Sequence, residues 1–506
     1  MMTRSVVEYL ERSAARFPDK TAVDDGSTAL TYRQLRSGAR RIGAALAERV
    51  QAVREPVAVF LDKTAESIMA FQGVLYSGNF YCPLDSEMPP DRIRAILSVT
   101  DPKVILTDEA HRAAAEQFAG AARIETMEEL LALPEHPGRE ESVDRILSGC
   151  TETDPLYVLF TSGSTGVPKG VLVSHRVIIN YAEWLEETFS MDSEVVIGNQ
   201  APLYFDISMH DTYGAFYFGG TLVIIPPALF SFPARLIEFM NEKKISSILW
   251  VPSAMGIFAA LKAFRSGLPQ YLQTVMFAGE VLPRRNLDYW MEHLPDTVFA
   301  NLYGPTETFV CTGYICDGTE PAGEPMPIGK PIANSTALLL TEDGREAAPG
   351  ETGELCLRGS CLATGYYNNP EKTGEVFVQN PLQAKYPDRI YRTGDLVKYN
   401  EQGDLIYLSR RDNQIKHMGY RIELGEIETA GYGIPEIRDC VCFYDYSRKR
   451  IVFCYDGAEI EKKSLRAALA EKIPSYMMPG RFIHLDALPH NANGKIDRKK
   501  LSAEYS

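Results

Sequence analysis

The chain has 506 residues, too many for one compact core, so two or more domains are expected. Its 45% hydrophobic and 24% charged residues are typical of a globular protein and exclude a disordered or fibrous one. A net charge of −15 argues against a protein that binds nucleic acid or an anionic membrane surface, because both ligands are negatively charged.

The nine cysteines are scattered and odd in number, and no two of them form a CxxC pair. A disulfide framework or a zinc site is therefore not expected, and a reducing, cytoplasmic location fits best. Residues 1–17 place charges among apolar residues at helical spacing, which is not the pattern of a signal peptide. No apolar run is long enough to cross a bilayer.

Short apolar runs rich in Val, Ile, Leu and Phe alternate with longer amphipathic stretches. Uninterrupted apolar runs indicate strands buried on both faces, and hence an α/β fold of stacked layers. Strands are predicted over 57–61, 104–107, 156–160, 195–198, 221–225, 248–251, 275–278 and 298–302. Covering helices are predicted over 234–244 and 284–293.

From about Ala337 short strands follow one another closely, at 337–341, 354–358 and 405–408, which predicts a β-rich subdomain. A domain boundary is predicted at Arg411–Asp412. It separates a large N-terminal domain, residues 1–411, from a small α+β C-terminal domain, residues 412–506. The small domain is expected to hold strands at 439–444 and 451–455, a helix at 462–472 and a glycine-containing loop at 491–495.

Residues 161–170 read TSGSTGVPKG and directly follow a predicted strand. Glycines and small hydroxyl residues let backbone N–H groups approach phosphate oxygens closely, and Lys169 adds a positive charge. The string differs from the common P-loop because Gly170, not Ser or Thr, follows the lysine. The alternative is a Gly/Ser surface loop, but the position after a buried strand favours a polyphosphate site.

This string and seven others, in order, resemble the adenylate-forming enzymes. More narrowly, they resemble the amino acid adenylation domains of non-ribosomal peptide synthetases and free-standing relatives such as D-alanine–carrier protein ligases. The other seven are LTYRQL (30–35), FDIS (205–208), NLYGPTE (301–307), GELCLRGSCLATGY (353–366), YRTGDL (391–396), SRRDNQIKHMGYRIELGEIE (409–428) and NANGKIDR (491–498).

The resemblance implies ATP and Mg²⁺ as cofactors. It places Tyr303 against adenine, Thr306 at the α-phosphate, Glu307 on Mg²⁺ and Asp395 on the ribose hydroxyls. Without it, Tyr303 is better interpreted as a core tyrosine and Asp395 as a turn residue. Further nucleotide-binding residues implied are Thr161, Ser162, Gly163, Ser164, Thr165, Gly166, Gly279, Glu280, Asn301, Leu302, Gly304, Tyr407 and Arg410.

Lys495, in the Asn-Gly-Lys sequence of the small domain, is the catalytic residue that the resemblance implies, together with Lys169 and Thr306. It would bridge the substrate carboxylate and the α-phosphate, where negative charge accumulates in the transition state. The alternative is an exposed lysine in a basic tail, since Lys499 and Lys500 follow.

Asp412 resembles the hinge of a mobile C-terminal domain that would alternate between two poses. One pose would bring Lys495 to the adenylation site. The other would present Lys416 and Gly419 to a thiol-bearing partner, with Gly419 leaving room for a pantetheine arm. Ser409 stands where the family usually has glycine.

Asp206 is the residue most informative about the substrate, because its counterpart in the family pairs with the α-ammonium of an amino acid. A buried unpaired carboxylate is costly, which favours a cationic ligand, although Asp206 alone is better interpreted as a helix N-cap. The pocket implied is mostly apolar and predicts a small or medium neutral amino acid, with identity and chirality open. Its residues are Asp206, Ile207, His210, Leu249, Met276, Ala278, Leu302, Val310 and Cys311.

Only eight residues follow Arg498, too few for a carrier domain. The expected function is therefore ATP-dependent activation of an amino acid and its transfer to a separate phosphopantetheinylated carrier protein, unless the chain is a piece of a larger synthetase. One alternative is an acyl-CoA synthetase using free coenzyme A, which Asp206 argues against. Another is a non-catalytic nucleotide-binding protein, which the presence of Lys169, Glu307 and Lys495 argues against.

Overall fold

The computed structural model describes residues 3–134, 136–163, 168–320, 325–411, 414–489 and 496–506. Contacts between residues divide the chain into two compact units. The first comprises Met1–Ser86, Thr100–Leu159 and Val171–Ser409, and the second comprises Glu87–Val99, Phe160–Gly170 and Arg410–Ser506. Among the helices of the described ranges, none combines the length and the apolar character that crossing a membrane requires.

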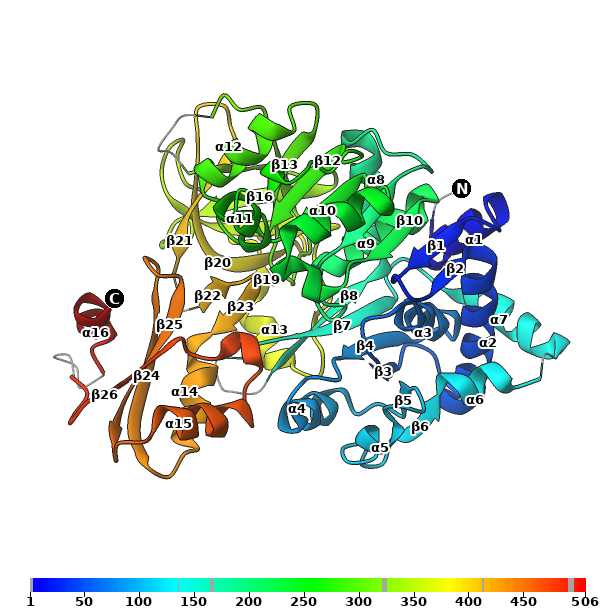
Figure 1. The fold of residues 1–506 in the computed structure, drawn as a ribbon, viewed down its shortest axis with the longest axis horizontal. Helices are drawn as coiled ribbons and strands as arrows, with labels where there is room; N and C mark the ends of the chain where they lie inside the picture. Colours follow the sequence, from blue (N-terminus) through cyan, green and yellow to red (C-terminus); the bar gives the residue numbers. More distant parts are fainter. Residues whose placement is uncertain (1–2, 135, 164–167, 321–324, 412–413, 490–495) are drawn as a thin grey trace. The chain divides into compact units, whose positions relative to one another are not determined.

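The larger sheet of the first unit has 14 strands within the described residues (Figure 1). Their order is β16-β17-β20-β21-β15-β14-β13-β12-β11-β9-β10-β1-β2, with β19 beside β20. The stretch from β13 to β1 is parallel, as expected for apolar strands covered on both faces. Its strands are β1 (Thr21–Asp24), β9 (Val196–Asn199), β10 (Thr221–Ile224), β11 (Ser247–Trp250), β12 (Thr274–Ala278) and β13 (Val298–Tyr303).

Antiparallel strands extend this sheet beyond β13, because β14 turns back and pairs with it. The segment predicted to be β-rich from residue 337 is rich in strands, and these strands continue the larger sheet. The strands are β2 (Ala29–Thr31), β14 (Thr312–Cys316), β15 (Pro327–Pro331), β16 (Ser335–Leu340), β17 (Gly353–Gly359), β19 (Phe377–Gln379), β20 (Arg389–Tyr399) and β21 (Leu405–Arg410).

The smaller sheet has seven strands in the described residues, in the order β18-β8-β7-β4-β3-β5-β6. Strands β7, β4, β3, β5 and β6 are parallel, and β3 and β4 are buried along their whole length. The bounds are β3 (Pro56–Phe60), β4 (Phe80–Leu84), β5 (Val104–Thr107), β6 (Arg123–Thr126), β7 (Pro155–Thr161), β8 (Lys169–Ser174) and β18 (Gly365–Tyr366).

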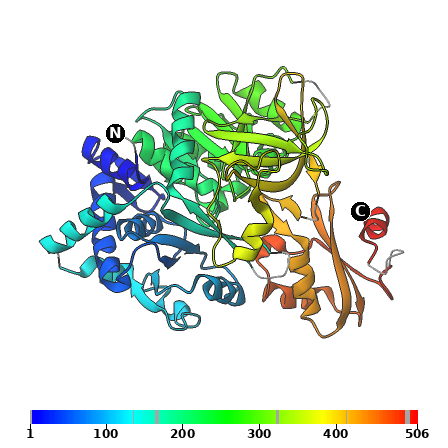
Figure 2. The same ribbon diagram turned by 180° about the vertical axis from the view of Figure 1, so that it is seen from behind.

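The helices begin where local sequence supplies a cap. Thr31, Thr64 and Thr126 each accept a backbone N–H at the start of a helix. Helices α2, α6 and α7 lie together beside the seven-stranded sheet in both views (Figure 1, Figure 2). The helices are α1 (Val7–Arg16), α2 (Tyr32–Val50), α3 (Ala65–Tyr76), α4 (Pro90–Thr100), α5 (Arg112–Ala115), α6 (Met127–Ala132), α7 (Pro137–Gly149), α8 (His175–Thr188), α9 (Ile207–Phe218), α10 (Pro233–Glu242), α11 (Pro252–Ala260), α12 (Arg284–His293) and α13 (Pro370–Val376).

Helix α9 lies between the two sheets of the first unit. Its Tyr213 hydroxyl hydrogen-bonds that of Tyr81 on β4 of the smaller sheet, at 3.0 Å. Its other side packs against β9, β10 and β11 of the larger sheet. Every residue of the helix except Tyr217 is buried, including the polar residues His210 and Asp211.

The second unit contains a two-stranded and a three-stranded sheet within its described residues. The hairpin is β22 (Gln414–His417) with β23 (Tyr420–Glu423). The other sheet joins β24 (Ile437–Asp445), β25 (Arg450–Gly457) and β26 (Arg481–His484). Helices α14 (Leu424–Tyr432) and α15 (Lys462–Ala470) share a core with them, and α16 (Arg498–Tyr505) follows near the end. Predicted strands and helices match the observed bounds within two residues in both units.

Gly329 in β15 tests how far backbone packing depends on glycine. Its φ is +76°, and an added Cβ would lie 1.9 Å from the carbonyl oxygen of Gly313. Gly344 has a similar φ of +80° but open space around it. We expect Gly344→Ala to lower the free energy of unfolding by about 1 kcal/mol, because only the left-handed backbone is strained. Gly329→Ala should cost at least ~2 kcal/mol more in urea unfolding, because backbone must also move. Equal costs would contradict the close packing of β15 on β14.

Candidate nucleotide and substrate site

The described part of the phosphate loop lies in the second unit. The Ser162 hydroxyl donates to the carbonyl of Arg421 at 2.9 Å and accepts from the N–H of Glu423 at 2.8 Å. The Gly163 N–H donates to a carboxylate oxygen of Glu426 at 3.2 Å. Lys169, the first residue of β8, has its ammonium 3.5 Å from the Glu423 carboxylate. Ser164, Thr165 and Gly166 lie outside the described residues.

These contacts show what the loop can bind. Its backbone N–H and its lysine both face negatively charged oxygen atoms, here supplied by two glutamates of the same unit. A loop of glycine and small residues with these donors also suits phosphate oxygens. Thr161, the last residue of β7, keeps a buried hydroxyl that makes no hydrogen bond with the described residues.

Glu426 has a second partner that the sequence did not indicate. The Arg92 guanidinium on α4 forms a buried ion pair with it. Burial raises the pKa of Glu426, and the charge of Arg92 acts in the opposite direction. Glu426 belongs to one of the strings that carry the family resemblance, whereas nothing around Arg92 marks it as different from other helix-surface arginines.

Tyr303 and Asp395 are brought together from β13 and β20, 92 positions apart in the chain. Both are buried, and the Tyr303 hydroxyl hydrogen-bonds the Asp395 carboxylate. The Asp395 N–H is held by the Thr393 hydroxyl at 3.0 Å. The residues predicted to bind adenine and ribose are therefore direct neighbours in the first unit.

Gly304 follows Tyr303, and its lack of a side chain has a structural cause. A Cβ there would lie 1.4 Å from the carbonyl oxygen of Phe309. The chain therefore folds tightly back on itself between Gly304 and Phe309, which itself has a φ of +54°. Thr306 and Glu307 lie within this tight segment, Thr306 partly exposed and Glu307 fully buried.

Glu307 is oriented by a residue to which sequence reasoning gave no role. The Tyr366 hydroxyl on β18 donates to Glu307 Oε1 at 2.7 Å, and the Ala363 N–H donates to the Glu307 backbone carbonyl at 2.8 Å. The described residues hold no group of three His, Cys, Asp or Glu side chains arranged to bind a metal ion. A single carboxylate instead fits Mg²⁺ that arrives with nucleotide phosphates and keeps most of its water ligands.

The other predicted nucleotide residues lie in strands or directly after them. Gly279 has a φ of +92° immediately after β12, and Glu280 accepts the Ser253 N–H at 2.9 Å, so it is not a freely solvated charge. The Asn301 side chain donates to the Pro327 carbonyl at 2.7 Å. Tyr407 is partly buried in β21, and Arg410 ends that strand.

The predicted substrate residues lie on helix α9 and three neighbouring strands of the larger sheet. Leu249 and Met276 are paired across β11 and β12, and Ala278 and Leu302 are paired across β12 and β13. Val310 and Cys311 precede β14 and are buried. The Cys311 thiol contacts the Tyr303 carbonyl, which links this group of residues to the Tyr303–Asp395 pair.

Asp206 is the N-cap of α9, and its Oδ1 accepts the Ile207 N–H at 2.8 Å. A carboxylate has several acceptor lone pairs, so capping is compatible with binding an ammonium group as well. The negative charge of Asp206 adds to burial in raising the pKa of Tyr157 on β7, which places the carboxylate near that strand.

His210, one turn further along α9, is fully buried. Its Nδ1 hydrogen-bonds the Tyr181 hydroxyl at 2.9 Å, and its Nε2 has no partner among the described residues. Burial lowers the pKa of His210 to about 3, so the imidazole is neutral at physiological pH. It therefore supplies a hydrogen-bonding group without adding a charge.

The predicted thiolation residues of the second unit lie on a tight hairpin. Lys416 pairs with Arg421 across β22 and β23, and the two turn residues Met418 and Gly419 have φ of +52° and +83°. A two-residue turn with both φ values positive matches the twist of the strands and favours glycine. The predicted hinge Asp412 and the predicted catalytic Lys495 lie outside the described residues.

Comparison with known proteins shows which family the chain resembles. A family model described as AMP-binding enzyme matches residues 10–367. Tyrocidine synthase 3 of Brevibacillus parabrevis is 33% identical over 98% of this chain, which spans only 8% of that protein. Zwittermicin A synthase ZmaJ of Bacillus cereus is 30% identical over 99% of this chain and 95% of its own length.

Two solved structures share the fold over nearly the whole chain. PA1221, an NRPS protein containing adenylation and PCP domains, superposes with a TM-score of 0.83 at 25% identity, covering 98% of this chain and 84% of that one. IdnL1 superposes with a TM-score of 0.79 at 26% identity, covering 97% and 100%. The chain belongs to the AMP-binding, adenylate-forming enzyme family and is an adenylation domain of the non-ribosomal peptide synthetase type.

Proposed function

We propose that this adenylation domain activates a small or medium neutral amino acid with MgATP and transfers it to the phosphopantetheine thiol of a separate carrier protein. The amino acid carboxylate attacks the α-phosphorus of ATP and releases pyrophosphate. The carrier thiol then attacks the carbonyl carbon of the adenylate and releases AMP.

The placement of Asp206 carries this proposal. A carboxylate begins the buried helix α9, among strands whose predicted substrate-facing residues are apolar. Asp206 itself is half-buried, and its carboxylate can form a charge-assisted hydrogen bond with an ammonium group of a ligand. The apolar residues Leu249, Met276 and Ala278 suit a neutral side chain of modest size. Transfer to a carrier is supported by PA1221, described as holding adenylation and PCP domains.

Nucleotide binding rests on the described donors and acceptors. The Gly163 N–H and the Lys169 ammonium can both donate to phosphate oxygens. The Asp395 carboxylate can accept hydrogen bonds from the ribose hydroxyls. Glu307 would hold Mg²⁺, which supplies charge neutralisation for the phosphates when bound. Lys495 would place an ammonium group between the reacting carboxylate and the α-phosphate.

Amino-acid-dependent ATP–pyrophosphate exchange tests the proposal directly. The panel holds L- and D-amino acids, including D-alanine, β-amino acids, and fatty and aryl acids. Exchange with one neutral amino acid supports adenylation and names the substrate. Exchange only with acids that lack an amine would overturn the amino acid assignment and indicate an acyl-CoA synthetase instead.

Asp206→Asn separates ammonium recognition from helix capping, since asparagine also caps helices well. We expect the amino acid KM to rise at least ~10-fold, because a charge-assisted contact is lost, while the ATP KM stays nearly unchanged. The preference for the amino acid over its des-amino analogue should fall in parallel. An unchanged amino acid KM would mean that Asp206 only caps α9.

Lys495→Ala should lower the rate of adenylation at least ~10²-fold, as loss of one preorganised electrostatic group often does. Transfer from preformed adenylate to the carrier thiol should be much less affected. Exposed Lys500→Ala in α16 is the matched control and should leave both half-reactions unchanged. Equal losses in the two half-reactions would contradict a role for Lys495 in adenylation alone.

Tyr366→Phe removes only the hydroxyl that orients the Glu307 carboxylate. We expect the Mg²⁺ concentration for half-maximal exchange to rise at least ~10-fold, which corresponds to the loss of one hydrogen bond to a charged group. The neighbouring Tyr367, which packs edge-on against Phe80, supplies the control Tyr367→Phe. If Tyr366→Phe and Tyr367→Phe reach half-maximal exchange at the same Mg²⁺ concentration, Glu307 does not bind the Mg²⁺ ion.

A further inference from the structure

Behind the predicted amino acid site, helix α9 contains a buried carboxylate that the proposed chemistry does not use. Asp211 lies five positions after Asp206 on the same helix and is fully buried. Its Oδ2 accepts a hydrogen bond from the side chain of Asn199, the last residue of β9, at 2.7 Å. This contact joins α9 to the carboxyl end of a central strand of the larger sheet.

A lysine from the other sheet reaches the same place. Lys63 follows β3 of the seven-stranded sheet, and its ammonium donates to the Gln200 carbonyl at 2.9 Å, next to Asn199. The positive charge of Lys63 opposes the rise in the pKa of Asp211, and the negative charge of Asp211 opposes the fall in the pKa of Lys63. Lys63 and Asp211 are therefore bound to adjacent residues, Lys63 to the Gln200 carbonyl and Asp211 to the Asn199 amide, and through this segment they link α9 to both sheets.

The surroundings of this pair are rich in unused acceptors. Within the described residues, Asn199 Oδ1, Gln200 Oε1 and Asp211 Oδ1 are buried without a hydrogen-bond donor. The Lys63 ammonium carries three N–H donors, one of which is used by the Gln200 carbonyl. Buried acceptors without donors are costly, so they favour a positive charge in their neighbourhood.

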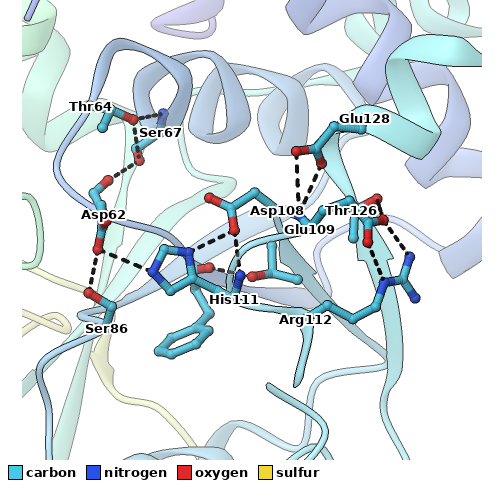
Figure 3. A network of polar contacts seen from close by, with 12 residues as sticks. Asp62, Thr64, Ser67, Ser86, Asp108, Glu109, His111, Arg112, Thr126 and Glu128 are labelled. Carbon is cyan, nitrogen blue, oxygen red and sulfur yellow. Dashed lines mark hydrogen bonds and ion pairs between the residues drawn. The ribbon is translucent and has the colours of Figure 1, made fainter. Parts of the chain in front are cut away.

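The loop that presents Lys63 is itself held in place (Figure 3). The Asp62 carboxylate is 3.4 Å from His111 Nε2 and accepts the Ser86 hydroxyl, and His111 Nδ1 is 2.7 Å from Asp108. Thr64 caps α3 through the Ser67 N–H. The residues on either side of Lys63 are therefore fixed at the carboxyl ends of β3, β4 and β5, which orients the lysine in advance.

We propose that Lys63 and Asp211 are positioning residues for the amino acid: through their hydrogen bonds to the adjacent residues Gln200 and Asn199 they hold helix α9 between the two sheets, so that Asp206 lies at the depth where it receives the substrate ammonium. The proposal rests on the proposed function of this site. Neither residue touches substrate; both act through α9.

Stability alone does not explain the pair. Burial raises the pKa of Asp211 to about 7 and lowers that of Lys63 to about 8, so each charge is costly in the folded protein. Because the pKa of Asp211 is raised, the folded protein holds a proton there more tightly than the unfolded chain. Ionisation of Asp211 therefore lowers the free energy of unfolding as pH rises towards 7. The lowered pKa means that charged Lys63 costs stability below about pH 8. A neutral replacement should therefore fold at least as well.

Asp211→Asn is the central test, because asparagine keeps the shape and can still accept the Asn199 hydrogen bond. We expect the amino acid KM in exchange to rise about tenfold, with the ATP KM within about twofold of wild type and the Tm unchanged or higher. Lys63→Met should give the same pattern, and Lys63→Arg should restore much of the affinity. The double variant should be no worse than Asp211→Asn, since the pair acts as one unit.

The pH dependence of the amino acid KM gives an independent readout. The groups facing Asp211 are Lys63, Asn199 and Tyr181; burial keeps Tyr181 protonated and neighbouring His210 neutral. The wild-type KM should therefore be lowest between about pH 7 and 8, where Asp211 is ionised and Lys63 protonated. It should rise on both sides of this window, and Asp211→Asn should remove the dependence on the acid side.

The matched controls are Asp24→Asn and Lys243→Met, which break a partly buried ion pair of 2.8 Å in the same unit. They should leave the amino acid KM unchanged. If wild type shows exchange with an amino acid and Asp211→Asn has the same KM for it, the positioning role is overturned and the proposed function stands. A fall in Tm large enough to explain the higher amino acid KM would also overturn the positioning role. Additive increases in KM in the variant that combines Lys63→Met with Asp211→Asn would overturn it too. Silence of wild type with every amino acid would overturn the proposed function, and the positioning role with it.

Discussion

Helix α9 is buried on nearly every side, yet it carries Asp206 at its start and His210 and Asp211 in its second turn. Placing polar and charged groups in a helix packed between two sheets is costly unless each has a partner. Asp211 is bound by Asn199 of the larger sheet, His210 by Tyr181 of α8, and Tyr213 of the same helix by Tyr81 of the smaller sheet. Lys63, which follows β3 of the smaller sheet, binds the Gln200 carbonyl next to Asn199. The position of α9, and with it the amino acid site, depends on these contacts.

The proposed nucleotide site depends on a different constraint, the close approach of backbone segments. Gly304 lies against the Phe309 carbonyl, and this tight fold holds Thr306 and the buried Glu307 in one short segment. Tyr303 on one side of it contacts Asp395, and Tyr366 orients Glu307 from β18. Three strands that are distant in sequence therefore supply one group of polar side chains around the end of β13.

In the second unit, carboxylates interact with the phosphate loop. Glu426 accepts the Gly163 N–H and pairs with Arg92, while Glu423 lies beside Lys169. The same donors suit the phosphate oxygens of ATP, so the loop has affinity for anionic oxygen whichever group supplies it.

The sequence by itself determined the α/β class, the bounds of the strands and helices named from it within two residues, and the family, because apolar periodicity and ordered motifs are local properties. It also named Asp206, Tyr303, Glu307 and Asp395 through the resemblance, and their roles stay predictions, as does the boundary at Arg411–Asp412. It did not show that the β-rich segment extends the larger sheet, because pairing of β14 with β13 is a tertiary choice. Nor did it single out Tyr366, Arg92, Lys63 or Asp211. Each looks ordinary in its own segment, and only the packing of distant elements buries it beside a partner and gives its charge or hydroxyl a function.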